Sequence, residues 1–453
     1  MPDTYAVIGA GPSGLAAGRA LKRDDIPFVV YERHDGIGGM WDITNPGTPI
    51  YESAHFISSR TLSALDGLPF PEDYPDYPRH DQLLAYLREF ARRFRLEPHV
   101  RLSTGVERIE RRPEGGWTVV LDNGEEVDHA GVIMASGSQW TPNLPDYPGE
   151  WDGDAYHSKH YRSRDQLRDR RVLVVGAGNS GCDIACQAAT AADAAAISTR
   201  RAYWIVPKHI FGQPTDVFAR STPGFVPGPV EQRFFAVLLR TVVGDLKRYG
   251  WPEPDHLPLA THPILNSEIL LHLAHRDLVH RPDLERLEGD RVRFVDGTVE
   301  PYDLIIWATG YRLSWPYLDR DELRWPRPND PGLFLNVFSR DHDDLFALGF
   351  VETDAGAWPH ISLQADLISQ VILDQHERPA QAARWRSFKQ RDVDLEGGIE
   401  HADSPRHDYY VSDAHYRRYA AELLRALQRG ELDEFATSGG AGLVERIRTR
   451  LVG

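Results

Sequence analysis

The chain has 453 residues and a formal net charge of −16, from 51 Lys and Arg against 67 Asp and Glu. This length predicts two or three domains at roughly 150 residues each, and 41% hydrophobic with 26% charged residues is typical of globular proteins. The acidic balance argues against nucleic acid and acidic membranes as partners, because such binding depends on clustered Lys and Arg.

A glycine-rich turn near the N-terminus predicts a first nucleotide-binding unit. An apolar strand at residues 5–8 precedes a G-x-G-x-x-G motif, and a helix at 15–23 and a second strand at 28–32 follow it. The glycines of the motif are Gly9, Gly11 and Gly14. They permit a tight turn, a close approach to pyrophosphate, and packing of helix on strand. Glu32 ends the second strand, where a carboxylate can accept hydrogen bonds from ribose hydroxyls.

The residues that follow predict a helix, a hairpin and a returning strand. The helix is expected at 80–94, the hairpin at 119–127 and the buried strand at 131–135. Prolines and a glycine between residues 142 and 149 then indicate a crossing into another domain.

The same order of elements is repeated later in the chain. A strand at 172–175, a second glycine turn, a helix at 182–191 and a strand at 194–199 form the second unit. The residues of this turn are Gly176, Gly178, Asn179, Ser180 and Gly181. Its last strand leads into Arg200 and Arg201 and not into a carboxylate. Guanidinium groups bind phosphate in pairs of hydrogen bonds, so this unit is predicted to bind NADPH. The alternative is that both arginines are merely solvated.

The remaining elements complete an α/β fold of two Rossmann-like domains. A second hairpin at 291–299, a buried strand at 303–310 and a helix at 359–373 that packs back on the first domain are expected. We therefore predict two three-layer ββα domains, the second inserted into the first. The predicted boundaries are 1–155 for the first part of the first domain, 156–300 for the inserted domain, and 301–453 for the second part with a C-terminal helical tail.

The linker between the two units resembles a known family fingerprint. Residues 151–161 are similar to the F-x-G-x-x-x-H-x-x-x-(Y/F) motif of flavin-containing monooxygenases, with Trp151 in place of the usual Phe. Three further segments resemble family motifs: G-G-x-W at 38–41, G-N-S-G-x-D-I-A at 178–185 and A-T-G-(Y/F) at 308–311. Related Baeyer–Villiger enzymes usually carry Trp where this chain has Tyr161, so the resemblance favours heteroatom oxidation.

This resemblance implies cofactors and a reaction. FAD would lie on the first domain and NADPH on the second. Flavin contacts are implied for Gly39, Met40 and Trp41, and contacts at the domain crossover for Thr309 and Gly310. The implied reaction is oxygenation of soft nitrogen or sulfur atoms of a small molecule by O₂, through a C4a-hydroperoxide of the flavin. His157 is expected to orient the linker and NADP, and not to transfer a proton.

One residue departs from the family pattern. Ile57 occupies the position at which many members carry an asparagine that helps to hold the oxygenated flavin. Ser58, Ser59 and His55 are the nearby side chains that could replace the missing amide. We therefore assign Ile57, Ser58 and His157 to the flavin face or to cofactor positioning. An isoleucine here predicts weaker coupling of NADPH use to oxygenation, or a different substrate geometry.

Other readings stay open. Baeyer–Villiger oxygenation of ketones, an uncoupled NADPH oxidase or flavin reductase, and a redox-sensing binding protein all fit the two nucleotide units. Trp204 and Trp358 are candidates for the substrate cleft.

Cysteine usage and the start of the chain point to the compartment. Cys182 and Cys186 are four residues apart, which places them on one buried helix face, and they do not form the C-x-x-C of redox flavoproteins. We predict no metal site. With only two cysteines, no apolar run of membrane-spanning length and no visible signal peptide, a cytoplasmic location is expected. A homodimer is compatible with the sequence.

Overall fold

The first parallel sheet lies between a helical layer and a small antiparallel sheet, in a computed structural model that describes residues 3–220, 228–399, 401 and 408–437. Its strand order is β23-β7-β1-β2-β3. The strands are β1 (Tyr5–Ile8), β2 (Phe28–Tyr31), β3 (Val100–Arg101), β7 (Gly131–Met134) and β23 (Leu345–Ala347). The helices are α1 (Pro12–Arg23), α2 (His80–Arg93) and α7 (Trp358–Glu377), and the antiparallel strands are β4 (Val106–Arg111), β5 (Trp117–Leu121) and β6 (Glu126–His129).

The side-chain alternation of β1 explains these layers. Val7 packs in the cluster that contains the helices, whereas Ala6 and Ile8 pack with the antiparallel strands. Because successive residues of a strand point to opposite faces, one short apolar strand supports both layers. α7 packs against α1, which confirms the predicted return of that helix to the first domain.

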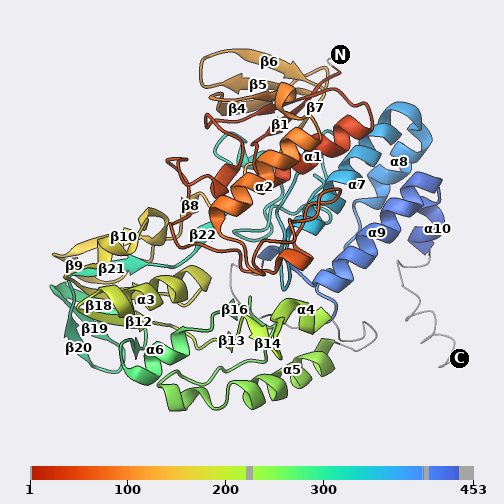
Figure 1. Ribbon diagram of the computed structural model, residues 1–453. Coiled ribbons are helices and arrows are strands. Elements are labelled where there is room, and N and C mark those ends of the chain that lie inside the picture. The colour runs from red at the N-terminus through yellow and green to blue at the C-terminus, as the bar shows by residue number, and fades with distance from the viewer. Residues whose placement is uncertain (1–2, 221–227, 400, 402–407, 438–453) are drawn as a thin grey trace, which may run out of the picture.

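The second parallel sheet repeats this construction below the first in Figure 1. Its strand order is β10-β21-β11-β12-β17. The strands are β10 (Asp154–His157), β11 (Arg171–Val175), β12 (Ala194–Ser198), β17 (Val279–Arg281) and β21 (Leu304–Trp307). Leu173 and Val175 face the sheet formed by β9 (Gly149–Trp151), β18 (Leu284–Gly289), β19 (Arg291–Phe294) and β20 (Val299–Pro301), while Val172 and Val174 face α3 (Asn179–Ala191).

The chain passes between the two units twice, and the two crossings lie side by side. β8 (Thr141–Pro142) leaves the first unit and pairs antiparallel with β22 (Tyr311–Arg312), which returns to it. The second unit is therefore inserted into the first, as the sequence predicts. The predicted boundaries divide the sheets of the second unit, since β9 ends at residue 151, β10 spans residue 156 and β21 begins at residue 304, and all three strands pair in those sheets.

The remaining elements surround these two units. α8 (Pro379–Phe388), α9 (Asp413–Arg429) and α10 (Leu432–Thr437) extend the helical layer of the first unit, in agreement with the expected helical tail. The second unit carries α4 (Thr215–Arg220), α5 (Gly228–Val242), α6 (Ile269–His275) and the strand pairs β13 (Ile205–Val206) with β16 (Ile264–Leu265) and β14 (His209–Ile210) with β15 (Gln213–Pro214). A last pair joins β24 (Glu352–Thr353) to β25 (Tyr410–Val411).

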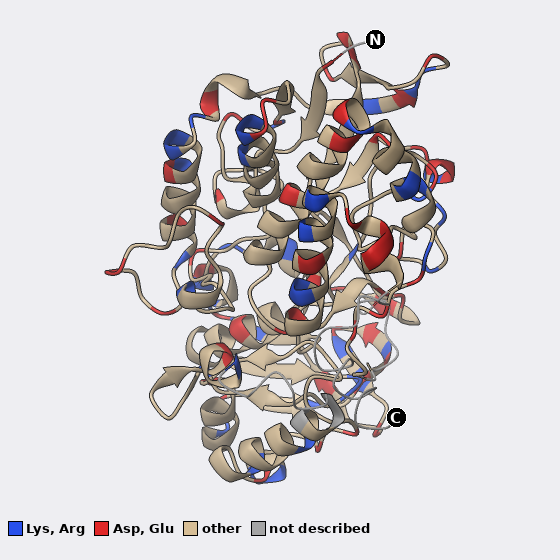
Figure 2. Cartoon of the chain, turned by 90° about the vertical axis from the view of Figure 1, so that its right-hand side faces the viewer, with Lys and Arg blue, Asp and Glu red and all other residues tan. Residues whose placement is uncertain are grey.

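Across the described part of the chain, no helix combines the length and the apolar character that crossing a membrane requires. Figure 2 shows acidic and basic residues interspersed along the helices, so neither sign forms a continuous face on that side.

Candidate functional site: a cleft between two glycine turns

A cleft of about 1600 Å³ lies between the two units and is lined by both glycine turns. This volume exceeds the roughly 300–1,000 Å³ of typical ligand pockets. Gly9 and Gly11 line it from the first unit, and Gly176 and Gly178 line it from the second. The carboxyl ends of two parallel sheets thus face one shared space, which is where open α/β sheets bind ligands.

The first glycine turn is shaped by backbone contacts that leave no room for side chains. Gly9 has a φ of 107°, and a Cβ added there would lie 2.8 Å from the carbonyl oxygen of Ala135. A Cβ at Gly14 would lie 1.8 Å from the carbonyl oxygen of Gly9. Gly14 does not line the cleft and instead packs α1 on β1, the role expected for the third glycine.

Glu32 is held rigidly at the end of β2. Its side chain is 5% exposed and lines the cleft. One carboxylate oxygen accepts a hydrogen bond from the backbone N–H of Ala10 at 2.7 Å, and the other accepts one from His34 at 2.9 Å. Each oxygen retains acceptor capacity. The geometry therefore suits a fixed acceptor for sugar hydroxyls.

The second glycine turn repeats the first almost exactly in its constraints. Gly176 has a φ of 103°, and a Cβ there would lie 2.5 Å from the carbonyl oxygen of Ala308. A Cβ at Gly181 would lie 2.0 Å from the carbonyl oxygen of Gly176. Asn179 and Ser180 line the cleft. The amide of Asn179 also holds the neighbouring segment, since its Oδ1 accepts from the backbone N–H of Leu265 at 2.9 Å.

The predicted arginine pair is divided by the structure. Arg200 is exposed and lines the cleft at the end of β12. Arg201 does not line it and forms an ion pair with Asp255 at 3.5 Å. Of this pair, only Arg200 is therefore placed to meet a phosphate in the cleft.

The residues implied to contact flavin lie at the meeting point of the two units. Gly39, Met40 and Trp41 line the cleft in a short 3-10 turn (Gly39–Trp41). The indole of Trp41 packs edge-on against Phe56, with ring centroids 5.3 Å apart, and lies 6.3 Å from Trp358. Trp358 also lines the cleft, as the sequence suggested.

Trp204 does not share this position. It packs with Val206 and Leu239 in a separate cluster of the second unit, and its indole N–H donates to the backbone of His256 at 2.8 Å. Trp204 is absent from the cleft lining, so the prediction that it belongs to the substrate cleft is not supported.

The segment that carries Ile57 forms part of the cleft wall. Ile57, Ser58 and His55 line the cleft, and Ser59 does not. The hydroxyl of Ser58 accepts a hydrogen bond from Ser63 at 2.8 Å. Ile57 supplies an apolar surface that can exclude water but cannot form a hydrogen bond. Ser58 and His55 are thus the polar side chains nearest in sequence that reach this space.

His157 lies behind the cleft and fixes a crossing. It is 2% exposed, and its Nδ1 accepts from the backbone N–H of Lys159 at 3.1 Å. Its Nε2 then carries the proton and donates to the carbonyl of Gly310 at 2.9 Å. Burial lowers the pKa of His157 to about 4, so the ring is neutral near pH 7. His157 therefore braces the return crossing and does not contact the cleft.

Thr309 and Gly310 lock the same crossing from the other side. The Thr309 hydroxyl donates to the carbonyl of Asn143 at 2.5 Å, and the backbone N–H of Asn143 donates to Gly310 at 2.9 Å. Both residues also line the cleft. The A-T-G-Y segment thus combines a binding surface with a structural joint.

Several lining residues were not identified from the sequence. The guanidinium of Arg33 stacks 4.1 Å from the ring of Trp140, whose carbonyl accepts from Lys159 at 2.5 Å. On the second unit, Asp283 accepts a hydrogen bond from Tyr147 at 2.7 Å. No motif marks these positions. Arg33 directly follows Glu32, and that adjacency was the one available signal.

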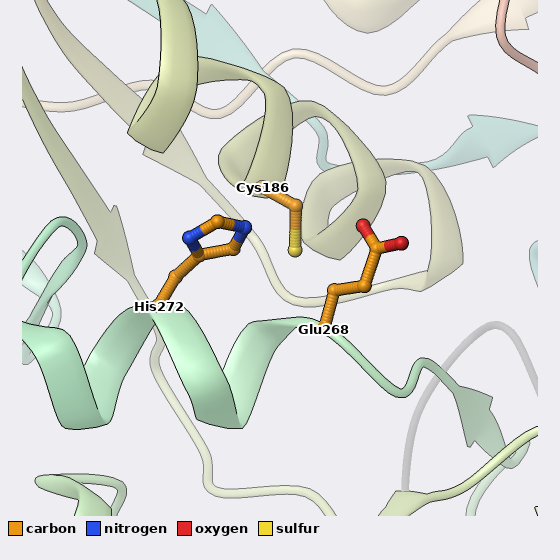
Figure 3. A group of neighbouring side chains, drawn as sticks. All are labelled: Cys186, Glu268 and His272. Atoms are coloured by element: carbon orange, nitrogen blue, oxygen red, sulfur yellow. The ribbon is translucent and has the colours of Figure 1, made fainter.

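A group of potential metal ligands lies outside the cleft. Figure 3 shows Cys186 on α3 with Glu268 and His272, whose ligand atoms lie within 4.8 Å of one another. Burial raises the pKa of the Cys186 thiol, which donates weakly to Asn266 Oδ1 at 3.8 Å. Structural zinc sites have four ligands. This group has three candidate ligands, one of which is a protonated thiol, so it does not make such a site. Both cysteines are buried and free.

Taken together, these features define a flavoprotein with two dinucleotide sites. In both turns a Cβ would clash with neighbouring backbone, so glycines leave the backbone open to a ligand. The helix after each turn directs its N-terminus at the cleft, and both turns therefore fit a pyrophosphate. The flavin-binding monooxygenase-like family model matches residues 3–412.

Known proteins agree with this assignment. A human putative dimethylaniline monooxygenase [N-oxide-forming] 6 is 31% identical over 84% of this chain and 74% of its own length. The S-allyl-L-cysteine S-oxygenase of Allium sativum superposes with a TM-score of 0.64 at 20% identity, over 97% of this chain and 94% of its own. A cyclohexanone monooxygenase does so with a TM-score of 0.70 at 17% identity, over 94% and 98%. The chain belongs to the flavin-binding monooxygenase-like family and is an FAD-dependent NADPH monooxygenase.

Proposed function

We propose that this enzyme uses NADPH and O₂ to oxygenate soft nitrogen or sulfur atoms of small molecules. The observation that carries the proposal is the single cleft lined by both glycine turns, with Glu32 on one side and Arg200 on the other. The overall reaction consumes NADPH, a proton and O₂, and yields NADP⁺, water and the oxygenated substrate. Bound FAD supplies the capacity to accept a hydride and to activate O₂.

The protein's own side chains bind, orient and exclude water in this proposal. Glu32 accepts hydrogen bonds from the ribose of FAD, and Arg200 pairs with the 2′-phosphate of NADPH. Phe56, Ile57 and Trp358 form an apolar wall beside the reacting region. Such a wall keeps water away from reactive groups. No side chain is required as a nucleophile.

The choice of heteroatom oxidation over ketone oxidation rests on two observations. Tyr161 stands where the related Baeyer–Villiger enzymes usually carry Trp. In the structure Tyr161 is fully buried and its hydroxyl donates to Gln187 on α3 at 2.9 Å. The relative at 31% identity is named as N-oxide-forming, which favours the same assignment for this chain.

A competition assay tests this proposal. The purified flavoprotein is given NADPH in air together with a dialkyl sulfide, a tertiary amine and a cyclic ketone. We expect sulfoxide or N-oxide with little lactone, and measure H₂O₂ in parallel. Lactone as the main product would favour Baeyer–Villiger oxygenation. H₂O₂ without an oxygenated product would identify an uncoupled NADPH oxidase, which Ile57 makes the second candidate.

A further inference from the structure

A partly buried hydrogen-bonded bridge joins the two units next to the second glycine turn. Asp183 lies on α3, and its carboxylate binds partners from two other segments. Its Oδ2 accepts a hydrogen bond from the hydroxyl of Tyr51 in the first unit at 3.1 Å. Its Oδ1 accepts one from the side-chain amide of Asn266 at 3.0 Å. The bridge therefore runs from the first unit through α3 to the start of α6.

The orientation of Asn266 is fixed by the helix that it caps. Its Oδ1 accepts hydrogen bonds from the backbone N–H groups of Glu268 and Ile269, both at 2.8 Å. Its amide nitrogen must therefore point toward Asp183, so Asp183 acts as the acceptor there. Tyr51 supplies the second donor, and the bridge has a defined polarity.

The charges around Asp183 divide into those that oppose ionisation and those that favour it. Burial raises the pKa of Asp183, and the nearby Glu268 acts in the same direction. Lys208 and the two hydrogen-bond donors oppose that shift. What remains accessible of Asp183 faces the cleft, which it helps to line. Tyr51 is 5% exposed, and burial together with Asp183 raises its pKa well above the ordinary value, so it stays a donor.

Tyr51 and Asp183, the two residues that join the units, belong to segments that shape the cleft. Tyr51 lies on the loop that continues to Phe56 and Ile57. Asp183 lies one helical turn after Asn179 of the glycine turn, and both side chains bind the segment around β16. Other hydrogen bonds join the units elsewhere, such as the backbone N–H of Ser59 to Asp216 of α4 at 2.7 Å and His209 to Asp76 at 3.0 Å. The bond from Tyr51 reaches α3, the helix of the second glycine turn.

We propose that Asp183 is a positioning residue that, through Tyr51, holds the helix of the second glycine turn against the loop that carries Ile57. The bridge thereby sets the distance between the two cofactors. This inference rests on the proposed function in one respect, namely that both cofactors bind these turns. A misplacement of about 1 Å can slow a reaction by about 100-fold, so a modest shift of α3 has a large effect on hydride transfer.

Tyr51→Phe is the most selective test, because it removes only the hydroxyl that binds Asp183 and Ser180 of the second unit and leaves Asp183 bonded to Asn266. We expect the rate of flavin reduction at saturating NADPH to fall about tenfold or more, while flavin content and the Kd for NADP⁺ stay nearly constant. With Tyr51 in place, Asp183→Asn should keep much of the wild-type rate, since its amide oxygen can accept from Asn266 and its amide nitrogen can donate to the Tyr51 hydroxyl once that hydroxyl turns to accept. Asp183→Ala should not.

The matched control is Tyr416→Phe. Tyr416 is fully buried on α9, and its hydroxyl has two partners, Gln364 at 2.8 Å and the carbonyl of Leu335 at 2.9 Å, as the Tyr51 hydroxyl has Asp183 and Ser180. Tyr416 does not line the cleft. Its replacement should cost comparable stability and leave the reduction rate unchanged.

Amide hydrogen exchange gives a readout that needs no cofactor turnover. Tyr51→Phe should speed exchange at residues 178–183 and 51–57, and Tyr416→Phe should not. Unchanged exchange in these segments, or equal effects of the two tyrosine variants on reduction, would overturn the proposal. A wild-type protein that binds no flavin would instead overturn the proposed function, and the exchange result would still decide whether the bridge holds α3.

Discussion

Glu32 and Arg200 follow equivalent strands of the two units, and the protein holds them in opposite ways. Glu32 is 5% exposed and each of its oxygens receives a backbone N–H, whereas Arg200 is exposed at the edge of the cleft. The glycine turns that precede them have nearly the same constraints. The repeated fold thus supplies a common phosphate cradle, and one side chain at the strand end distinguishes the sites. We infer that the rigid site suits a resident cofactor and the open site an exchanging one.

The largest expected effect comes from replacing the third glycine of each turn separately, which places a methyl group against the backbone. Gly14→Ala and Gly181→Ala would place a methyl group 1.8 and 2.0 Å from a backbone carbonyl oxygen, and we expect each to cost about 3 kcal/mol or more. Gly14→Ala should yield protein without flavin. Gly181→Ala should retain flavin that NADPH no longer reduces. Flavin absorbance before and after NADPH measures both.

A control separates these effects from glycine replacement in general. At Gly36 the added Cβ would lie 3.4 Å from the Asp42 carboxylate, an ordinary contact, so Gly36→Ala should resemble the wild type. Loss of flavin from Gly181→Ala as well would contradict the assignment of separate nucleotide sites to the two units.

The second test concerns the divided arginine pair. Arg200→Ala removes a charge-assisted contact to phosphate, so we expect the KM for NADPH to rise about tenfold or more with little change for NADH. Arg201→Ala serves as the matched control, because Arg201 pairs with Asp255 outside the cleft. Steady-state kinetics with both nucleotides measure the effect. Equal losses in the two variants would contradict the assignment of the phosphate to Arg200 alone.

The third test lies where the units meet. Ile57→Asn restores an amide to the cleft wall, and one hydrogen bond of about 1 kcal/mol predicts about a fivefold gain in oxygenated product relative to H₂O₂. Ile57→Val keeps the wall apolar and should change this ratio little. Product and H₂O₂ formed per NADPH are the quantities to measure. A lower ratio for Ile57→Asn would mean that this wall works better when it is dry.

The smallest expected effect is on stability against acid. Buried histidines of both units contribute to it, including His360 of the first unit, whose pKa burial lowers to about 4. Burial lowers the pKa of both His157 and His280 to about 4. Between the unfolded value near 6.5 and about 4, the unfolded chain binds more protons than the folded one, so stability falls as the pH falls. The Tm should drop by several degrees from pH 7 to pH 5. Replacing His280 with Asn should reduce that slope, and an unchanged slope would contradict the lowered pKa.

The sequence predicted structure correctly where local steric constraints determine which residue type fits a position. The glycine spacings predicted both turns because only glycine fits where a Cβ would meet a carbonyl at 2.8 Å or less, as at Gly9 and Gly176. The helices at 80–94 and 359–373 also formed, within a few residues of their predicted limits. These signals come from neighbours in the sequence.

The failures share a different cause. β10 pairs with β21, about 150 residues away, and three of its four residues are not buried, so no local pattern marks it as a strand. The predicted boundaries at 155 and 300 therefore cut through β10 and place β21 with the first domain. Likewise, the sequence could not divide Arg200 from Arg201, because Asp255 is supplied by a distant loop. The cytoplasmic location and the homodimer stay predictions.

The pairing of β8 with β22 has a consequence for how such a molecule can be rebuilt. Because the chain enters and leaves the second unit through two adjacent strands, that unit has neighbouring ends, which is the arrangement that tolerates domain insertion. The first unit is joined to the inserted unit at one place, the paired strands β8 and β22. We expect that a chimera cut within 141–142 and 311–312 can exchange the whole predicted NADPH-binding half between relatives and leave the flavin-binding half with its core intact.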